Sequence, residues 1–141
     1  MANLVNILLL YTVMDAWREK YHSICITDDT DHNVVCIDCQ KGLMIKETVP
    51  SEIIEQIREK IISAGTYDLK YKSCSADAAF SDGVINHFFI NDGEKLKEIE
   101  IQDLSRVSEE KVKPLMDMMD SIKDLLIPKG IDDYYFSLLF E

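Results

Sequence analysis

The sequence predicts an α+β fold: a mostly antiparallel sheet of about five or six strands with two helices packed on one face. Short β-rich runs separated by polar turns fill the N-terminal third of the chain. Two amphipathic helical patterns follow, and between them lies a hairpin pattern that turns at Asp92-Gly93. Asp-Gly favours a tight turn because both residues tolerate positive φ. Because most predicted strands are joined by turns and few by helices, the sheet is expected to be antiparallel.

The N-terminal third is predicted to contain four strands. Its first segment is nearly continuously apolar, which fits a buried strand or a buried helix, and its β-forming residues favour the strand. If the loop between the second and third strands closes symmetrically, Cys25 lies opposite Cys36. Lys41-Gly42 is expected to form the turn before the fourth strand. The four expected strands are Leu4 to Met14, Tyr21 to Thr27, Val34 to Asp38 and Leu43 to Val49.

The first helix is predicted to begin at Pro50, because the fixed φ of proline suits a first helical turn. Isoleucines then recur at helical spacing until Gly65 ends the pattern. This spacing indicates an amphipathic helix that packs an isoleucine stripe onto the sheet. The stripe comprises Ile53, Ile54, Ile57, Ile61 and Ile62.

The central hairpin, Val84 to Ile101, has two possible registers with different chemical consequences. A two-residue loop at Asp92-Gly93 places His87 opposite Glu98. A three-residue loop with a bulge at Gly93 places His87 opposite Lys97 instead. A histidine beside a carboxylate can form a proton-transfer pair, whereas a histidine beside a lysine cannot.

The second helix is predicted to start at Ser108, whose side chain can cap it. Pro114 comes too late for a first turn, so a kink or a restart is expected near Lys113. Pro128-Lys129-Gly130 is expected to end the helix, and the aromatic tail from Ile131 to Glu141 to add an edge strand. The predicted buried stripe comprises Val112, Leu115, Met116, Met119, Ile122 and Leu126.

The composition predicts one acidic, soluble domain that spans residues 1–141. The formal net charge is -11 and the isoelectric point is about 4.6. Nucleic acids and anionic membranes repel such a surface, so neither is an expected partner. The charge suits a basic partner, a metal ion or simple solubility. Ile7 to Met14 is too short to span a bilayer and lacks the flanks of an export signal, so a cytoplasmic location with reduced thiols is expected.

The most motif-like feature is Cys36-x-x-Cys39, and ordinary thiols are its preferred interpretation. A zinc site would need two more ligands, for which Cys25, Cys74, His22 and His32 are candidates. A redox dithiol would need its pair at a helix N-terminus, but this pair lies at the end of a predicted strand. The sequence therefore predicts no cofactor.

Asp29-x-Asp31-x-Asn33 matches the opening of a calcium-binding loop. The match then fails, because Val34 takes the place of the required glycine and Gln40 that of the bidentate glutamate. An acidic hairpin loop is the better interpretation. Sequence motifs for serine hydrolases, phosphate-binding loops and zinc proteases are absent, so we do not expect an enzyme.

The second predicted helix also carries a candidate interaction surface. Asp117, Asp120 and Asp124 follow at i, i+3 and i+7, so they form an acidic ridge opposite the buried stripe. Asp132, Asp133 and Tyr134 add carboxylates beside an aromatic ring. Such a set can dock a basic protein, the aromatic side chain acting as an anchor and the carboxylates steering the encounter. The plainer alternative is a solvated helix face.

In its size, its acidity and its lack of a catalytic motif, the chain resembles the immunity proteins that protect bacteria from toxins. The resemblance implies an inhibitor that binds and neutralises a basic partner, such as a nuclease toxin, and we expect this function. The alternative is a small enzyme or ligand-binding domain with a pocket near His87 and Glu98, or near Cys74. A structural subunit with another partner is the third possibility.

Overall fold

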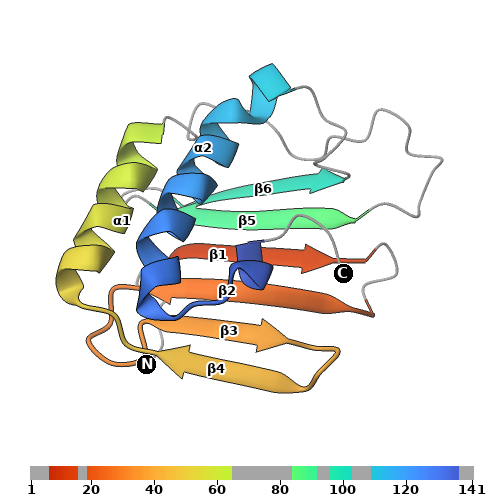
Figure 1. Ribbon diagram of the computed structural model, residues 1–141. Helices are drawn as coiled ribbons and strands as arrows, with labels where there is room; N and C mark the ends of the chain where they lie inside the picture. Colours follow the sequence, from red (N-terminus) through yellow and green to blue (C-terminus); the bar gives the residue numbers. More distant parts are fainter. Residues whose placement is uncertain (1–6, 16–18, 65–83, 92–95, 103–108, 137–141) are drawn as a thin grey trace.

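The computed structural model describes residues 7–15, 19–64, 84–91, 96–102 and 109–136 (Figure 1). Within these ranges, the strands are β1 (Ile7–Met14), β2 (Tyr21–Thr27), β3 (Val34–Asp38), β4 (Leu43–Glu47), β5 (Ile85–Asn91) and β6 (Leu96–Gln102). The helices are α1 (Ser51–Ala64) and α2 (Glu109–Leu126), followed by the short 3-10 helices η4 (Ile127–Lys129) and η5 (Asp133–Phe136).

The six strands form one antiparallel sheet in the order β4-β3-β2-β1-β5-β6. The first four strands follow one another as a meander, and β5 then adds to the free side of β1. Both helices lie side by side over the same face of the sheet (Figure 1). The predicted α+β fold is therefore confirmed, and the first apolar segment is a strand from Ile7 to Met14, as the sequence favoured.

The core lies between this face of the sheet and the two helices. Tyr11, at the centre of β1, pairs with Ile24 on one side and with Phe88 on the other. The rings of Tyr11 and Phe88 stack with centroids 4.6 Å apart. The Tyr11 hydroxyl accepts a hydrogen bond of 2.9 Å from Asn86 Nδ2, and burial raises the pKa of this hydroxyl. This hydrogen bond satisfies the hydroxyl group, so that the polar end of Tyr11 can be buried in the core.

The register between β2 and β3 differs from the prediction. Cys25 lies opposite Val35, and Ile24 lies opposite Cys36. The pairing expected from a loop that closes symmetrically was therefore wrong by one residue. The cause is Asn33, whose buried side chain donates to the Val49 carbonyl and accepts from the Val49 N–H, both at 2.9 Å. This anchor holds Asn33 at the inner end of the loop, where its carbonyl also accepts from the N–H of Thr27.

Helix α1 begins directly after Pro50 and ends at Ala64, as the sequence predicted. Ile54, Ile57 and Ile61 are buried, whereas Ile62 is 55% exposed. The predicted stripe was therefore too wide at its C-terminal end, because Ile62 lies one position beyond the face that meets the sheet.

Helix α2 runs without interruption from Glu109 to Leu126 with Pro114 inside it, so of the two predicted alternatives the restart near Lys113 is wrong, and the kink stays a prediction. Its buried side chains include most of the predicted stripe and also Met118. Met116 is only half-buried. The helix ends as expected, since Gly130 takes a left-handed φ of 94° directly after η4.

The residues after Gly130 form a 3-10 turn and no edge strand, which corrects the prediction as far as Phe136. Ile131 donates its N–H to the Leu126 carbonyl, and Asp132 Oδ1 accepts the N–H of Tyr134 at 2.9 Å. These local bonds favour a turn over an extended strand. The expected helix cap Ser108 lies outside the described residues, and so do Cys74 and the turn residues Asp92 and Gly93.

Candidate functional site

The hairpin of β5 and β6 has neither of the predicted registers. Asn91 pairs with Leu96, so four residues connect the strands, and His87 pairs with Glu100. The shift from the two-residue register is an even number of residues, so His87 and Glu98 still share a face of the sheet. His87 Nε2 and Glu98 Oε2 lie 2.6 Å apart.

The His87–Glu98 pair lies on the face of the sheet that the helices do not cover, because its neighbour Phe88 points into the core. The His87 side chain is 13% exposed, and its ring meets Phe89 edge-on with centroids 4.7 Å apart. A histidine bonded to a carboxylate is suited to accept or hold a proton. Two cavities lined by described residues lie elsewhere, one at the helices and one at the β3–β4 turn.

The cysteines of the Cys36-x-x-Cys39 motif lie in different environments. Cys36 is buried among the core side chains, and burial, together with the charges of Glu47 and Asp132, raises its pKa to about 12. Cys39 is half-buried and donates its Sγ–H to the carbonyl oxygen of Glu19 at 3.6 Å. Because the thiolate is the metal ligand and the nucleophile, Cys36 is poorly suited to either role at neutral pH.

Metal-binding geometry is not found at the other candidate positions that the structure describes. No group of three or more His, Cys, Asp or Glu side chains gathers there. In the loop that resembles a calcium site, the Asn33 amide is occupied by the backbone of Val49. Burial, and then the charge of Asp29, raise the pKa of Cys25.

The acidic ridge on α2 is exposed along its whole length, as the spacing predicted. Asp117, Asp120 and Asp124 are all exposed. Asp117 forms an ion pair of 2.9 Å with Lys113 one turn earlier. Among the described residues, no side chain forms an ion pair with Asp120 or Asp124. The ridge therefore divides into a neutralised end and an uncompensated part.

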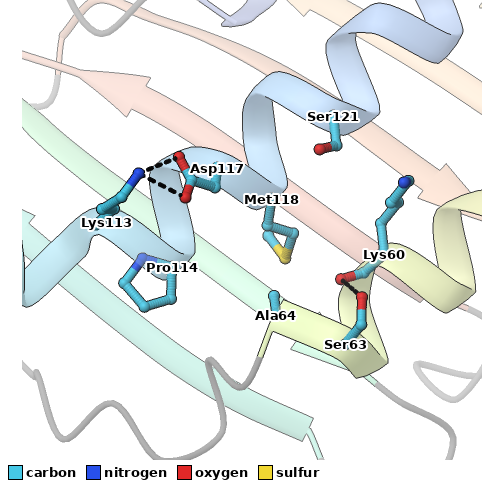
Figure 2. Close-up of a pocket in the computed structure, with 8 residues that line it drawn as sticks. All are labelled: Lys60, Ser63, Ala64, Lys113, Pro114, Asp117, Met118 and Ser121. Carbon is cyan, nitrogen blue, oxygen red and sulfur yellow. Dashed lines mark hydrogen bonds and ion pairs between the residues drawn. The ribbon is translucent and has the colours of Figure 1, made fainter.

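The neutralised end borders a groove of about 530 Å³ between the two helices (Figure 2). Asp117 and Lys113 stand together on α2, and Lys60 and Ser63 come from the facing end of α1. The charged side chains that line this groove are of both signs, whereas the uncompensated part of the ridge carries only negative charges. The lining residues are Lys60, Ser63, Ala64, Lys113, Pro114, Asp117, Met118 and Ser121.

A second cavity, of about 320 Å³, lies between the β3–β4 hairpin and η5, and we call it the C-terminal cleft. Three of its lining residues carry carboxylates. Asp38 is the most buried of them, at 1% exposure, whereas Asp132 and Asp133 are exposed. The lining residues are Asp38, Gln40, Lys41, Leu43, Ile45, Asp132, Asp133, Tyr134 and Tyr135.

The turn between β3 and β4 positions one wall of the C-terminal cleft. Gly42 takes a left-handed φ of 60° and donates its N–H to the Cys39 carbonyl, as expected for the predicted turn. Asp38 Oδ1 accepts the N–H groups of Gln40 at 3.0 Å and of Lys41 at 3.3 Å. The carboxylate thus holds the turn that presents Lys41.

Aromatic rings form the opposite wall. Tyr134 lies against the fully buried His22, with ring centroids 4.4 Å apart, and against Tyr135 at 5.4 Å. The ammonium of Lys41 lies 5.5 Å from the centroid of the Tyr134 ring. Burial raises the pKa of Tyr135, and the neighbouring acidic groups, Asp38 among them, raise it further.

The structure thus brings three of the predicted contact residues, Asp132, Asp133 and Tyr134, together at one cleft. Sequence reasoning missed Asp38 and Lys41 as members of this site. The alternation of β3 contained a signal for Asp38, since it shares the inward face with Val34 and Cys36.

No protein-family model matches this chain, and no curated protein matches it with significant similarity. None of the helices among the described residues is both long enough and apolar enough to cross a membrane.

Proposed function

We propose that this chain is an interaction protein that binds a basic protein partner and neutralises it, as an immunity protein neutralises a toxin. The observation that carries this proposal is a set of exposed, uncompensated carboxylates. Within the described part of the chain, no side chain forms an ion pair with Asp120, Asp124, Asp132 or Asp133. Carboxylates without an internal ion-pair partner remain available to an external positive charge.

The charge of the chain supports the same proposal. A net charge of -11 repels nucleic acids and accelerates encounter with a positively charged surface. Tyr134 supplies an aromatic side chain next to the carboxylates of Asp132 and Asp133, and tyrosine is enriched among the residues that dominate binding energy. A nuclease toxin is the partner class we favour, because carboxylates can cover a site that binds phosphates.

The experiment uses the protein encoded directly upstream of this chain, the position in which we expect a toxin. That protein is expressed in a bacterial host with and without this chain, and growth and complex formation are measured. We expect an upstream protein that is basic, that stops growth alone and that becomes harmless in a stable complex with this chain. An upstream protein that is acidic, harmless alone or equally toxic in both strains contradicts the proposal.

The His87–Glu98 hydrogen bond favours a second candidate function, a small enzyme or ligand-binding domain on the face of the sheet opposite the helices. His87→Gln keeps a polar side chain but removes the imidazole ring. If the partner-binding function is right, His87→Gln leaves rescue of growth unchanged. If His87→Gln abolishes rescue while the complex still forms, the second candidate is favoured.

A further inference from the structure

We infer that the C-terminal cleft binds the cationic head of one lysine or arginine side chain. In the free protein, the ammonium group of Lys41 occupies the place of this cation. The identity of the incoming side chain as part of a basic protein rests on the proposed function. The recognition chemistry of the cleft itself does not, since it follows from the groups that line it.

The first supporting observation is the buried carboxylate of Asp38. At 1% exposure it is far less accessible than is usual for an aspartate. Its Oδ1 atom accepts two backbone N–H groups, and no described residue provides a hydrogen bond to Oδ2. A buried carboxylate with a spare oxygen at a cavity is stabilised by an opposite charge that enters that cavity.

The second observation is the aromatic wall. The face of a tyrosine ring attracts a cation within about 6 Å of its centroid. Lys41 Nζ lies at 5.5 Å from the Tyr134 centroid, so the chain already places one of its own ammonium groups there. Tyr134 in turn rests on the buried ring of His22, which holds its plane in position.

The third observation is the combination of size and charge. At about 320 Å³ the cleft is at the small end of ligand pockets, which suits one side-chain head better than a cofactor. Asp132 and Asp133 add two exposed carboxylates at its border. An arginine can bond both oxygens of a carboxylate and also stack on a tyrosine, and a lysine can replace Lys41 directly.

The test is an NMR titration of the isotope-labelled full-length chain with three small probes. N-acetyl-arginine amide and N-acetyl-lysine amide carry the two cations, and N-acetyl-citrulline amide is the neutral analogue of arginine. We expect saturable shifts of the Gln40, Lys41, Tyr134 and Tyr135 backbone amides with at least one cationic probe. We expect none with citrulline. The relative affinity for the two cations distinguishes guanidinium from ammonium recognition.

Variants then test the roles of the individual groups. Lys41→Gln removes the internal competitor and should tighten probe binding about 3- to 10-fold, the range of a partly desolvated cation–π contact. Lys46→Gln, an exposed lysine on β4, removes the same charge away from the cleft and should tighten binding less than 2-fold. The double variant Asp132→Asn/Asp133→Asn should weaken binding at least about 3-fold, whereas Glu52→Gln/Glu59→Gln should weaken it less than 2-fold.

The inference fails if the shifts do not saturate, if citrulline produces the same shifts, or if Lys41→Gln and Lys46→Gln have equal effects. The outcomes also separate this inference from the proposed function. Specific probe binding without a basic protein partner upholds the cleft and rejects the function. A neutralised basic partner, together with no probe binding, upholds the function and rejects the cleft.

Discussion

Asn33 joins two parts of the chain that the sequence pattern leaves unconnected. Its side-chain amide satisfies both backbone polar groups of Val49, which lies between β4 and α1. Asn33 and Val49 are both buried, at 2% and 3% exposure. Water therefore cannot easily replace these bonds, and one side chain holds the register of β2 and β3 and the path into α1 together.

Asn33→Ala is expected to lower the free energy of unfolding by about 2–4 kcal/mol, because it leaves a buried N–H and a buried carbonyl of Val49 without partners. Urea denaturation of the two proteins measures the difference. Gln56→Ala, at an exposed position of α1, is the control and should change stability by less than about 0.5 kcal/mol. A loss below about 1 kcal/mol for Asn33→Ala would show that the two bonds are not a structural anchor.

Cys36 is expected to lower the stability of the protein at alkaline pH. Its pKa is raised from 9.0 to about 12, chiefly by burial. Between these values the unfolded chain releases the thiol proton while the folded chain keeps it, so rising pH favours unfolding. The stability present below about pH 9 is therefore lost as the pH rises towards 12.

Cys36→Val should remove part of this alkaline loss, because valine keeps an apolar side chain of similar size without a titrating group. We expect wild-type stability to drop by roughly 1–2 kcal/mol more than that of the variant between pH 8.5 and pH 10.5. Chemical denaturation at the two pH values measures this difference. Parallel losses in both proteins would mean that Cys36 does not titrate differently on folding.

At the scale of the element, adjacent isoleucines of α1 provide a matched pair. Ile61 is fully buried and Ile62 is 55% exposed. Ile61→Ala should therefore cost about 2–5 kcal/mol, through lost burial and the cavity it leaves, and Ile62→Ala less than about 0.5 kcal/mol. Urea denaturation of both variants measures the two costs, and equal costs would contradict the orientation of α1 on the sheet.

Local residue patterns predicted the elements well, and tertiary anchors explain where they failed. β2 and β3 were predicted with the observed bounds, because alternation and turn residues act within a few positions. The pairing of β2 with β3 was missed by one residue, because it depends on the contact of Asn33 with Val49, which is distant in sequence. The hairpin register depended likewise on a connection longer than Asp92-Gly93 alone indicates.

At the candidate site, too, local patterns were predictable and contacts between distant parts of the chain were not. The helical spacing of Asp117, Asp120 and Asp124 was sufficient to predict their common exposure. The approach of Tyr134 to Asp38 and Lys41 was not predictable, because it needs η5 to fold back against β2. The residue pattern of the aromatic tail predicted a strand. In the structure, the Asp132 side chain caps a turn instead.

At the scale of the whole molecule, the core and the outer surface of the helices differ in character. The face of the sheet beneath the helices buries the core, and the outer surface of α2 and η5 carries the uncompensated carboxylates. Exposed charges act over about a Debye length, so the total charge of -11 governs the rate of encounter with a partner. The lifetime of the complex depends instead on the particular side chains buried at contact.

Because total charge governs the encounter rate and particular contacts govern the lifetime of the complex, one measurement can test the central claim. This claim is the binding of a basic protein by the exposed carboxylates of α2 and η5. The measurement is the dissociation rate of the complex with the upstream-encoded protein for two variants of equal charge. One changes Asp120, Asp124, Asp132 and Asp133 to Asn. The other changes Glu19, Glu47, Glu52 and Glu59, all exposed, to Gln.

Both variants should slow association similarly at low salt, since each removes four negative charges. We expect the aspartate variant to dissociate at least about 10-fold faster than wild type, and the glutamate variant to dissociate within about 2-fold of the wild-type rate. Equal dissociation rates for the two variants would contradict the account, because the carboxylates of α2 and η5 would then act only as part of the overall charge.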